Sequence, residues 1–242
     1  MNEFQLQTRA VKVNGFRWMD ADAYLFDIDG TLLVSRDRVH RNALHQAMRE
    51  AYGVDTTIDG IAYHGKTDLG ILRAALERVG ISGDEFQVNL PAALEVVCRE
   101  VSANADLVSP TVCSAIPEVL GELQAAGKLL GLASGNLESV GWLKVEAAGL
   151  REFFSFGCFS DRHESRSDIF SQGVTEVQRR LGESARVYFI GDTPEDIKAA
   201  RFANSKIVAV CTGIFGADEL TCLEPDVCVA SCAELLNKMP RE

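Results

Sequence analysis

An apolar run joined to a pair of carboxylates stands near the start of the chain, where residues 24–31 read YLFDIDGT. The run over 24–28 predicts a buried β-strand, because it is short and rich in aromatic and branched side chains. Asp27 and Asp29 are two residues apart, so their side chains can point the same way as the strand ends. Gly30 allows a sharp turn directly after them. The pair therefore suits a nucleophile and a metal ligand.

Two simpler interpretations of this pair are a polar turn and the opening of a calcium-binding loop. A calcium loop of the EF-hand type needs glycine at its sixth position and follows a helix, whereas here glycine is fourth and follows a strand pattern. The calcium interpretation therefore fails. The plain turn stays open until the other strand ends are considered.

Five further apolar runs predict strands, and segments with helical spacing separate successive runs. Helical spacing is clearest over 119–126, 143–148 and 169–181. This alternation is typical of a parallel sheet with crossover helices, so we predict a doubly wound α/β fold with a Rossmann-like core. The five runs are 129–133, 154–159, 187–190, 207–211 and 226–229.

The segment between the first two predicted strands is too long for one crossover. It contains its own helical patterns, over 43–51, 69–79 and 94–101. A structureless loop of this length is improbable. We therefore expect an all-helical domain over 35–111, inserted into a core formed by 1–34 and 112–242. The first twenty or so residues stay unassigned, either as an extra strand or as an arm.

Composition narrows the classes of protein. The chain has 242 residues, of which 47% are hydrophobic, which is enough for a substantial core and too apolar for a disordered chain. No apolar run approaches the roughly 18 residues of a membrane span. The net charge of −11 argues against nonspecific binding to nucleic acid or to an anionic membrane.

The cysteine pattern argues against a disulfide framework. Seven cysteines are an odd number, and they are scattered without a CxxC pair. The first 22 residues also lack the basic end and apolar stretch of a signal peptide. We therefore expect a reduced, cytoplasmic protein.

Two other strand ends carry polar groups. The second predicted strand ends in Ser134-Gly135-Asn136 at the start of a helix, where a hydroxyl and free N–H groups could bind phosphate or could simply cap the helix. The fourth ends in Asp192, followed by Thr193 as a predicted N-cap and Asp196 as a capping-box acid. Capping explains Asp196 as well as metal binding does, but it does not explain Asp192.

Ligands of open α/β sheets bind at the carboxyl ends of the strands. This topology brings together the carboxylates after the first and fourth predicted strands and the Ser134 hydroxyl. Clustered carboxylates repel one another and lose solvation when buried, so they need a cation. Hard oxygen ligands with room for water and phosphate favour Mg²⁺.

These motifs resemble those of the haloacid dehalogenase (HAD) superfamily. The Asp27 to Thr31 strand end, Ser134, and Asp192 followed by Asp196 are similar to its first, second and fourth motifs, in the right order, over about residues 23–229. The helical insertion resembles the C1-type cap of phosphoglycolate phosphatase-like members. The resemblance implies Mg²⁺-dependent phosphoryl transfer through an aspartyl-phosphate.

The resemblance also implies roles for individual residues. Asp27 would be the nucleophile, and Asp29 the general acid and later the base, with a pKa tuned near the working pH. Mg²⁺ would be held by Asp27, Asp192 and the backbone carbonyl of Asp29, with Asp196 binding directly or through water. The predicted substrate-binding residues are Ser134, Gly135, Asn136, Thr31, Lys66 and Lys144.

The third motif departs from the family pattern. It is normally a lysine before the helix that leads to the fourth strand, but residues 161–170 contain no lysine. We predict Arg166 as the catalytic cation, because an arginine can bind carboxylate or phosphate with two donors. Lys144 is the main alternative cation, followed by Arg162 or by no replacement at all. The simplest alternative role for Arg166 itself is a solvated charge in a loop.

In the insertion, the sequence over 64–68 reads HGKTD and opens a helical pattern. It resembles the loop with which C1 caps reach the substrate, so Lys66 could bind a carboxylate or phosphate. Equally, Thr67 and Asp68 could cap the helix and leave Lys66 in solvent. His40, His45 and His163 lack ligand spacing with one another and are interpreted as surface or cap residues.

We therefore predict a Mg²⁺-dependent phosphatase, a phosphoric monoester hydrolase, acting on a small phosphorylated metabolite. One alternative is a β-phosphoglucomutase-like phosphomutase. The cap of those enzymes usually carries Gly-x-x-Arg, whereas Asp68 stands at the arginine position here. A second alternative is a noncatalytic binding protein with the same fold. The identity of the substrate and the oligomeric state stay open.

Overall fold

A computed structural model of the chain describes residues 17–236. Most of the unassigned amino-terminal segment lies outside these residues. Within it, Trp18–Asp20 form a 3₁₀ turn that leads into the first strand. The Trp18 side chain is buried, and its carbonyl accepts a hydrogen bond from the Tyr24 hydroxyl.

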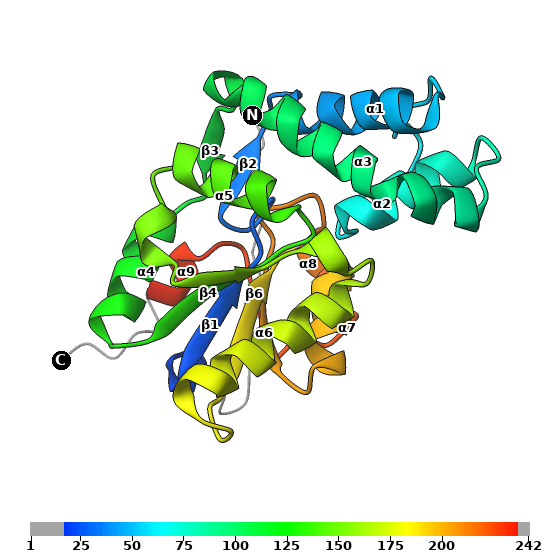
Figure 1. The fold of residues 1–242 in the computed structure, drawn as a ribbon. Helices are drawn as coiled ribbons and strands as arrows, with labels where there is room; N and C mark the ends of the chain where they lie inside the picture. Colours follow the sequence, from blue (N-terminus) through cyan, green and yellow to red (C-terminus); the bar gives the residue numbers. More distant parts are fainter. Residues whose placement is uncertain (1–16, 237–242) are drawn as a thin grey trace, which may run out of the picture.

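Six parallel strands form the central sheet, in the order β5-β4-β1-β6-β7-β8 (Figure 1). All six correspond to the predicted apolar runs, which confirms the doubly wound α/β prediction. β1 lies between β4 and β6, so the segments that follow these three strands emerge side by side. The strands are β1 (Ala23–Phe26), β4 (Leu129–Ala133), β5 (Phe156–Cys158), β6 (Val187–Gly191), β7 (Lys206–Val210) and β8 (Val227–Val229).

Helices cover both faces of the sheet. Apolar residues of α4 and α9 join one hydrophobic cluster, and those of α6, α7 and α8 join another on the opposite face. α6 begins before the predicted 169–181 segment, because its first turn consists of Arg166, Ser167 and Asp168 and carries no apolar residue. The core helices are α4 (Ile116–Ala125), α5 (Glu138–Ala147), α6 (Arg166–Leu181), α7 (Pro194–Phe202), α8 (Ala217–Thr221) and α9 (Ala233–Leu236).

A helical cap is inserted between β1 and β4. It consists of α1 (Val39–Tyr52), α2 (Asp68–Glu77) and α3 (Gly83–Ala103), which stand apart from the sheet in Figure 1. Its two connections to the core pair as an antiparallel ribbon of β2 (Leu33–Ser35) and β3 (Pro110–Val112). The helices have their own apolar cluster, which also includes Leu137 and Val140 from the core.

Side-chain caps fix the ends of the cap helices. The Thr67 hydroxyl accepts a hydrogen bond from Gly70 N at the start of α2, and the Ser82 hydroxyl accepts one from Glu85 N at the start of α3. α3 is longer than the predicted 94–101 segment, because the chain continues as a helix through Pro91. Among the described residues, no helix has the length and apolar character needed to span a membrane.

Candidate active site

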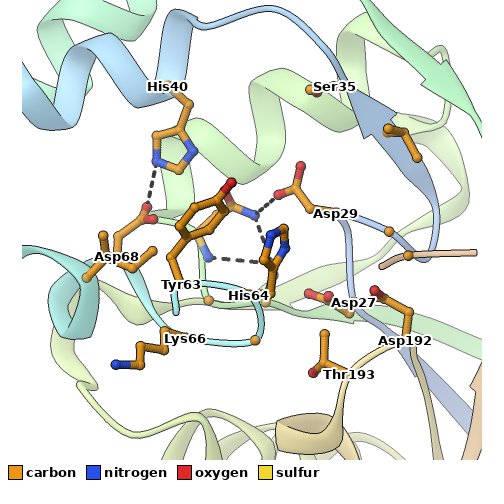
Figure 2. Close-up of a pocket in the computed structure, with 18 of the residues that line it drawn as sticks. Asp27, Asp29, Ser35, His40, Tyr63, His64, Lys66, Asp68, Asp192 and Thr193 are labelled. Atoms are coloured by element: carbon orange, nitrogen blue, oxygen red, sulfur yellow. Dashed lines mark hydrogen bonds and ion pairs between the residues drawn. The ribbon is translucent and has the colours of Figure 1, made fainter. Parts of the chain in front are cut away.

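A cavity of about 490 Å³ lies between the cap and the carboxyl ends of β1, β4 and β6 (Figure 2). This size is within the range of small-molecule sites. Its core side is polar, and its cap side combines aromatic, apolar and basic side chains. The core residues that line it include Asp27, Asp29, Ser134, Asn136, Lys144, Arg166 and Asp192, and the cap residues include His40, Leu44, Tyr63, His64, Lys66 and Asp68.

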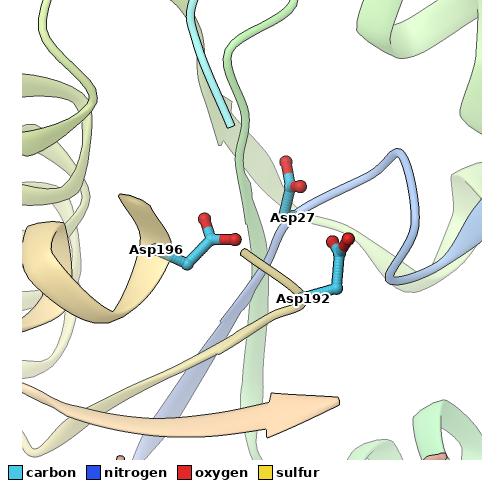
Figure 3. A group of neighbouring side chains, drawn as sticks. All are labelled: Asp27, Asp192 and Asp196. Carbon is cyan, nitrogen blue, oxygen red and sulfur yellow. The ribbon is translucent and has the colours of Figure 1, made fainter. Parts of the chain in front are cut away.

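Three carboxylates converge at the base of this cavity, as Figure 3 shows. Asp27 follows β1, Asp192 follows β6, and Asp196 lies in the first turn of α7. One oxygen of each lies within 4.8 Å of the others, and all three side chains are buried. The arrangement brings together residues that are distant in sequence, because β1 and β6 are neighbours in the sheet.

The electrostatics of these carboxylates fit a divalent cation. Burial raises the pKa of Asp27 to about 6, and the positive charge of Arg166 only partly opposes this shift. Burial, followed by the negative charges of Asp27 and Asp196, raises the pKa of Asp192 to about 8. A bound cation would stabilise the ionised form of both groups. Carboxylate oxygens are also the ligands that Mg²⁺ prefers.

The Asp192 carboxylate is in close contact with Thr31, Gly30 and Gly213. The buried Thr31 hydroxyl donates to Asp192 Oδ1 at 2.9 Å, so the structure places this predicted substrate-binding residue against a carboxylate. A Cβ on Gly30 or Gly213 would overlap Asp192 Oδ2. Gly213 was not predicted. Its signal in the sequence is weak, since it is a glycine shortly after the fifth sheet strand in chain order.

Asp196 makes the capping box that the sequence predicted. Its Oδ2 accepts hydrogen bonds from Thr193 N at 3.0 Å and from Thr193 Oγ1 at 2.7 Å. Its Oδ1 accepts from Arg166 Nε at 2.6 Å. Both oxygens therefore have protein donors, which favours an indirect contribution of Asp196 to metal binding.

Arg166 is buried among the carboxylates and is not a solvated loop charge. It is the first residue of α6, only 7% exposed, and its Nη2 lies 2.7 Å from Asp27 Oδ1. Burial works against its positive charge, but Asp196 and Asp27 raise its pKa above the ordinary value. The alternative cation Arg162 is exposed.

Lys144 contacts the second carboxylate of the strand-end pair. Its Nζ donates to Asp29 Oδ2 at 2.7 Å and to Asn136 Oδ1 at 2.9 Å. Asn136 Nδ2 also donates to Asp29 Oδ2, at 2.8 Å. Desolvation opposes ionisation of Asp29, but the charge and hydrogen bond of Lys144 outweigh it and lower its pKa. This differs from the expected pKa near the working pH, because the sequence did not show that Lys144 reaches Asp29.

A histidine that sequence analysis interpreted as a surface or cap residue joins this network. His40 Nδ1 lies 3.3 Å from Lys144 Nζ, and His40 Nε2 lies 3.0 Å from Asp68 Oδ2. Asp68 Oδ2 also accepts from Leu137 N at 2.8 Å. The network therefore links α1 and α2 of the cap to the core. Nothing in the spacing of these residues predicts it.

Ser134 and Gly135 lie where the cap meets the core. Asn136 Nδ2 donates to Ser134 Oγ at 2.9 Å, which leaves the serine proton for another acceptor. A Cβ on Gly135 would lie 2.5 Å from the Lys66 carbonyl oxygen, so the cap loop packs directly on this glycine. Asp68 N donates to the Gly135 carbonyl at 2.8 Å.

Lys66 was expected either to reach the substrate or to lie in solvent, and the structure favours the second position. It belongs to the cavity wall, but its side chain is exposed and its amine points away from Asp27 and Asp29 in Figure 2. Thr67 caps α2. The Thr67 hydroxyl also donates to the Glu164 carbonyl at 2.7 Å, which makes another contact between cap and core.

Structures of known proteins share this fold. A CbbY variant from Rhodobacter sphaeroides, solved with xylulose 1,5-bisphosphate, superposes with a TM-score of 0.68 at 20% identity, covering 91% of this chain and 100% of that one. A predicted phosphoglycolate phosphatase from Haemophilus somnus has a TM-score of 0.65 at 17% identity, covering 90% of this chain and 97% of that one. At these identities the likeness establishes the fold.

Sequence comparison identifies the family. Pyrophosphatase PpaX of Bacillus velezensis is 24% identical over 217 residues, which cover 89% of this chain and 94% of that protein. The family model described as haloacid dehalogenase-like hydrolase matches residues 21–204, which include Asp27, Ser134 and Asp192. The chain therefore belongs to the haloacid dehalogenase-like hydrolases, as its strand-end motifs predicted.

Proposed function

We propose that this protein is a Mg²⁺-dependent phosphatase that hydrolyses a small phosphorylated metabolite through an aspartyl-phosphate on Asp27. The observation that carries the proposal is the buried group of Asp27, Asp192 and Asp196, with Arg166 beside it and Ser134 lining the same cavity. A site of this kind can accept an anionic phosphate only where cations compensate its negative charge.

Asp27, Asp192 and the Asp29 carbonyl would hold the Mg²⁺, with Asp196 acting through water. When bound, the metal would offset the repulsion between the nucleophile and the phosphate and polarise a phosphoryl oxygen. Arg166 positions Asp27 through their ion pair. The Ser134 hydroxyl and the N–H groups of Gly135 and Asn136 are the candidate donors to the other phosphoryl oxygens.

The reaction proceeds in two displacements. In the first, a carboxylate oxygen of Asp27 forms a bond to phosphorus as the bond to the leaving oxygen breaks, and Asp29 donates a proton to the leaving group. Asp29 must be protonated for this step, and the negative charge of the bound phosphate would raise its pKa from the low value of the empty site. In the second, Asp29 removes a proton from water as that water attacks phosphorus, which releases phosphate and restores Asp27. Lys144 and Asn136 hold the Asp29 carboxylate in place between these roles.

The cap contacts favour a phosphatase over the phosphomutase alternative. Asp68 stands where mutases of this fold usually carry arginine. Its carboxylate already contacts His40 of the cap and Leu137 N of the core, so it links the cap to the core. It also adds negative charge near the cavity, which disfavours binding a second phosphate at this position.

Hydrolysis of p-nitrophenyl phosphate by wild type and Asp27→Asn tests the proposal. We expect Mg²⁺-dependent release of nitrophenolate by wild type and loss of turnover in the variant, since an amide oxygen is a poor nucleophile. Asp55→Asn is a matched control, because the Asp55 side chain lies in the cap and is 83% exposed. A broader panel should include inorganic pyrophosphate, the substrate class that the name of the Bacillus relative indicates. Wild-type inactivity across that panel would reject the phosphatase proposal.

A further inference from the structure

We propose that Tyr63 and His64 form an aromatic platform for the leaving group, so that the preferred substrates carry a planar aromatic ring joined to the phosphate by a short linker. This inference rests on the proposed phosphatase function and adds a substrate class to it. It concerns two cap residues that the reaction itself does not use.

The two rings lie in the loop between α1 and α2 and both line the cavity. Their centroids are 4.3 Å apart with an angle of 32° between the ring planes. Figure 2 shows them at the centre of the site, with His40 and Asp68 on one side and Asp27 and Asp192 on the other. A leaving group that extends from a phosphate at Asp27 toward the cap would meet these rings.

Contacts after the rings fix the loop against the core. Gly65 has φ +79°, and a Cβ there would lie 2.8 Å from Thr193 Oγ1. Arg166 Nη1 donates to the Gly65 carbonyl at 3.4 Å. The carbonyl of the next residue, Lys66, packs on Gly135. The loop therefore contacts Thr193, Arg166 and Gly135 beside the buried carboxylates, which sets the rings at a defined position and reduces the entropy lost on binding.

The surroundings of the rings suit a flat, weakly polar group. Leu44, Ile58 and Ile71 line the same cavity from the cap. Partial burial lowers the pKa of His64, which favours the uncharged imidazole for stacking.

Two of the basic cap side chains that line the cavity already have carboxylate partners. Arg41 is paired with Asp59, and His40 is paired with Asp68. An aromatic ring gains contact with the Tyr63 and His64 rings, which line the same cavity. Stacking of one base on an aromatic side chain changes affinity by about tenfold or more.

Matched substrates separate the aromatic contribution from the phosphate contribution. Uridine 5′-monophosphate and ribose 5-phosphate differ by the base, and pyridoxal 5′-phosphate supplies an aromatic ring without a sugar. We expect kcat/KM for one of the aromatic substrates to exceed that for ribose 5-phosphate by about tenfold, mainly through KM. A preference for uridine 5′-monophosphate identifies the ring as a nucleobase, and a preference for pyridoxal 5′-phosphate identifies it as a pyridine.

Variants at Tyr63 and His64 test whether these two rings cause the preference for aromatic substrates. In Tyr63→Leu the ratio of kcat/KM between the aromatic substrate and ribose 5-phosphate should fall toward one. Tyr63→Phe should keep the ratio, because stacking needs the ring and not the hydroxyl. His64→Asn should reduce it in part.

The outcomes distinguish this inference from the proposed function. If ribose 5-phosphate or an acyclic phosphate is hydrolysed as well as both aromatic substrates, the platform is rejected and the phosphatase stands. If no phosphate ester is hydrolysed, the proposed function fails. Calorimetric binding to Asp27→Asn then decides the platform separately: about tenfold tighter binding of an aromatic phosphate than of ribose 5-phosphate supports it, and equal affinities reject it.

Discussion

Arg166 partly compensates the negative charge of two buried carboxylates. Its Nη2 pairs with Asp27 and its Nε with Asp196, and the guanidinium is almost fully buried. Two ion pairs at fixed angles match the fork of an arginine better than the point charge of a lysine. An arginine therefore fits this position structurally, although the family pattern has lysine there.

Removing this charge should impair both activity and stability. Arg166→Met leaves two buried carboxylates without their partner, so we expect the metal-free protein to lose about 3–5 kcal/mol of unfolding free energy. The kcat should fall by about 10²–10³, since Asp27 is no longer positioned. Denaturant unfolding and p-nitrophenyl phosphate turnover measure the two effects. Arg179→Met on the same helix is the control, because the Arg179 side chain is 67% exposed. Unchanged turnover in Arg166→Met would show that this residue does not replace the third-motif lysine.

We predict that Lys144, through its effect on the pKa of Asp29, sets the acidic side of the pH profile. In wild type its charge keeps the pKa of Asp29 low, so Asp29 would be available as the proposed base even in acidic solution. Lys144→Met removes that charge and leaves the desolvation that raises the pKa. We therefore expect the acid limb of kcat, measured with p-nitrophenyl phosphate at saturating Mg²⁺, to move to higher pH. Lys198→Met, at an exposed lysine, should leave the limb in place. A limb at the same pH in Lys144→Met would contradict this role.

At the scale of elements, the cap is attached to the core by several short contacts around the loop before α2. Asp68 bonds to Gly135 and Leu137, and Arg73 of α2 forms a two-donor pair with Glu164 of the core. These contacts hold the cap over the carboxylates. A cap held in this way can shield the bound substrate from bulk water.

Gly135→Ala tests this closure. Its new Cβ would lie 2.5 Å from the Lys66 carbonyl, a backbone atom that cannot rotate away, so the cap loop must move outward. We expect kcat/KM to fall by about 10²-fold, because a displacement of about 1 Å misaligns the site. The melting temperature should change little, since moving the loop relieves the clash.

The control for this variant is Gly121→Ala on α4. A Cβ there meets no other atom within 4 Å, and alanine favours the helix by about 0.5–1 kcal/mol. It should melt slightly higher and keep full activity. Equal kcat/KM for Gly135→Ala and wild type would show that the loop does not need its observed position.

At the scale of the whole molecule, the buried carboxylates make the unfolding free energy depend on pH. The folded protein favours protonated Asp27 and Asp192, whose pKa values rise from 3.8 to about 6 and about 8. Between the ordinary pKa of 3.8 and the raised pKa values of about 6 and about 8, the folded state therefore binds more protons than the unfolded state. The unfolding free energy of the metal-free protein should therefore decrease as the pH rises from about 4 to about 8.

Mg²⁺ should reverse this loss, because it binds the ionised carboxylates. We expect the increase in melting temperature on adding Mg²⁺ to be larger near pH 8 than near pH 6, the two pKa values involved. Thermal unfolding with and without Mg²⁺ at both pH values measures it. Asp192→Asn should lose most of the Mg²⁺ effect, since it lacks one ligand charge. An equal Mg²⁺ effect at both pH values in wild type would contradict the linkage.

The fold and the base of the site could be predicted from the sequence because both depend on local patterns. Short apolar runs predicted the six strands, and parallel pairing then required the residues after β1, β4 and β6 to share one edge. That reasoning placed Asp27, Ser134 and Asp192 together. The role of each residue in catalysis stays a prediction.

Only the tertiary structure decided which distant side chains meet. Arg166 reaches Asp27, Lys144 reaches Asp29, and His40 of the cap reaches Lys144. Periodicity shows which face of a helix is buried but not how far the helix slides along the sheet or how the cap is oriented, and these displacements determine which charges touch. The sequence therefore determined where the carboxylates gather, and long-range packing determined which cations stabilise them.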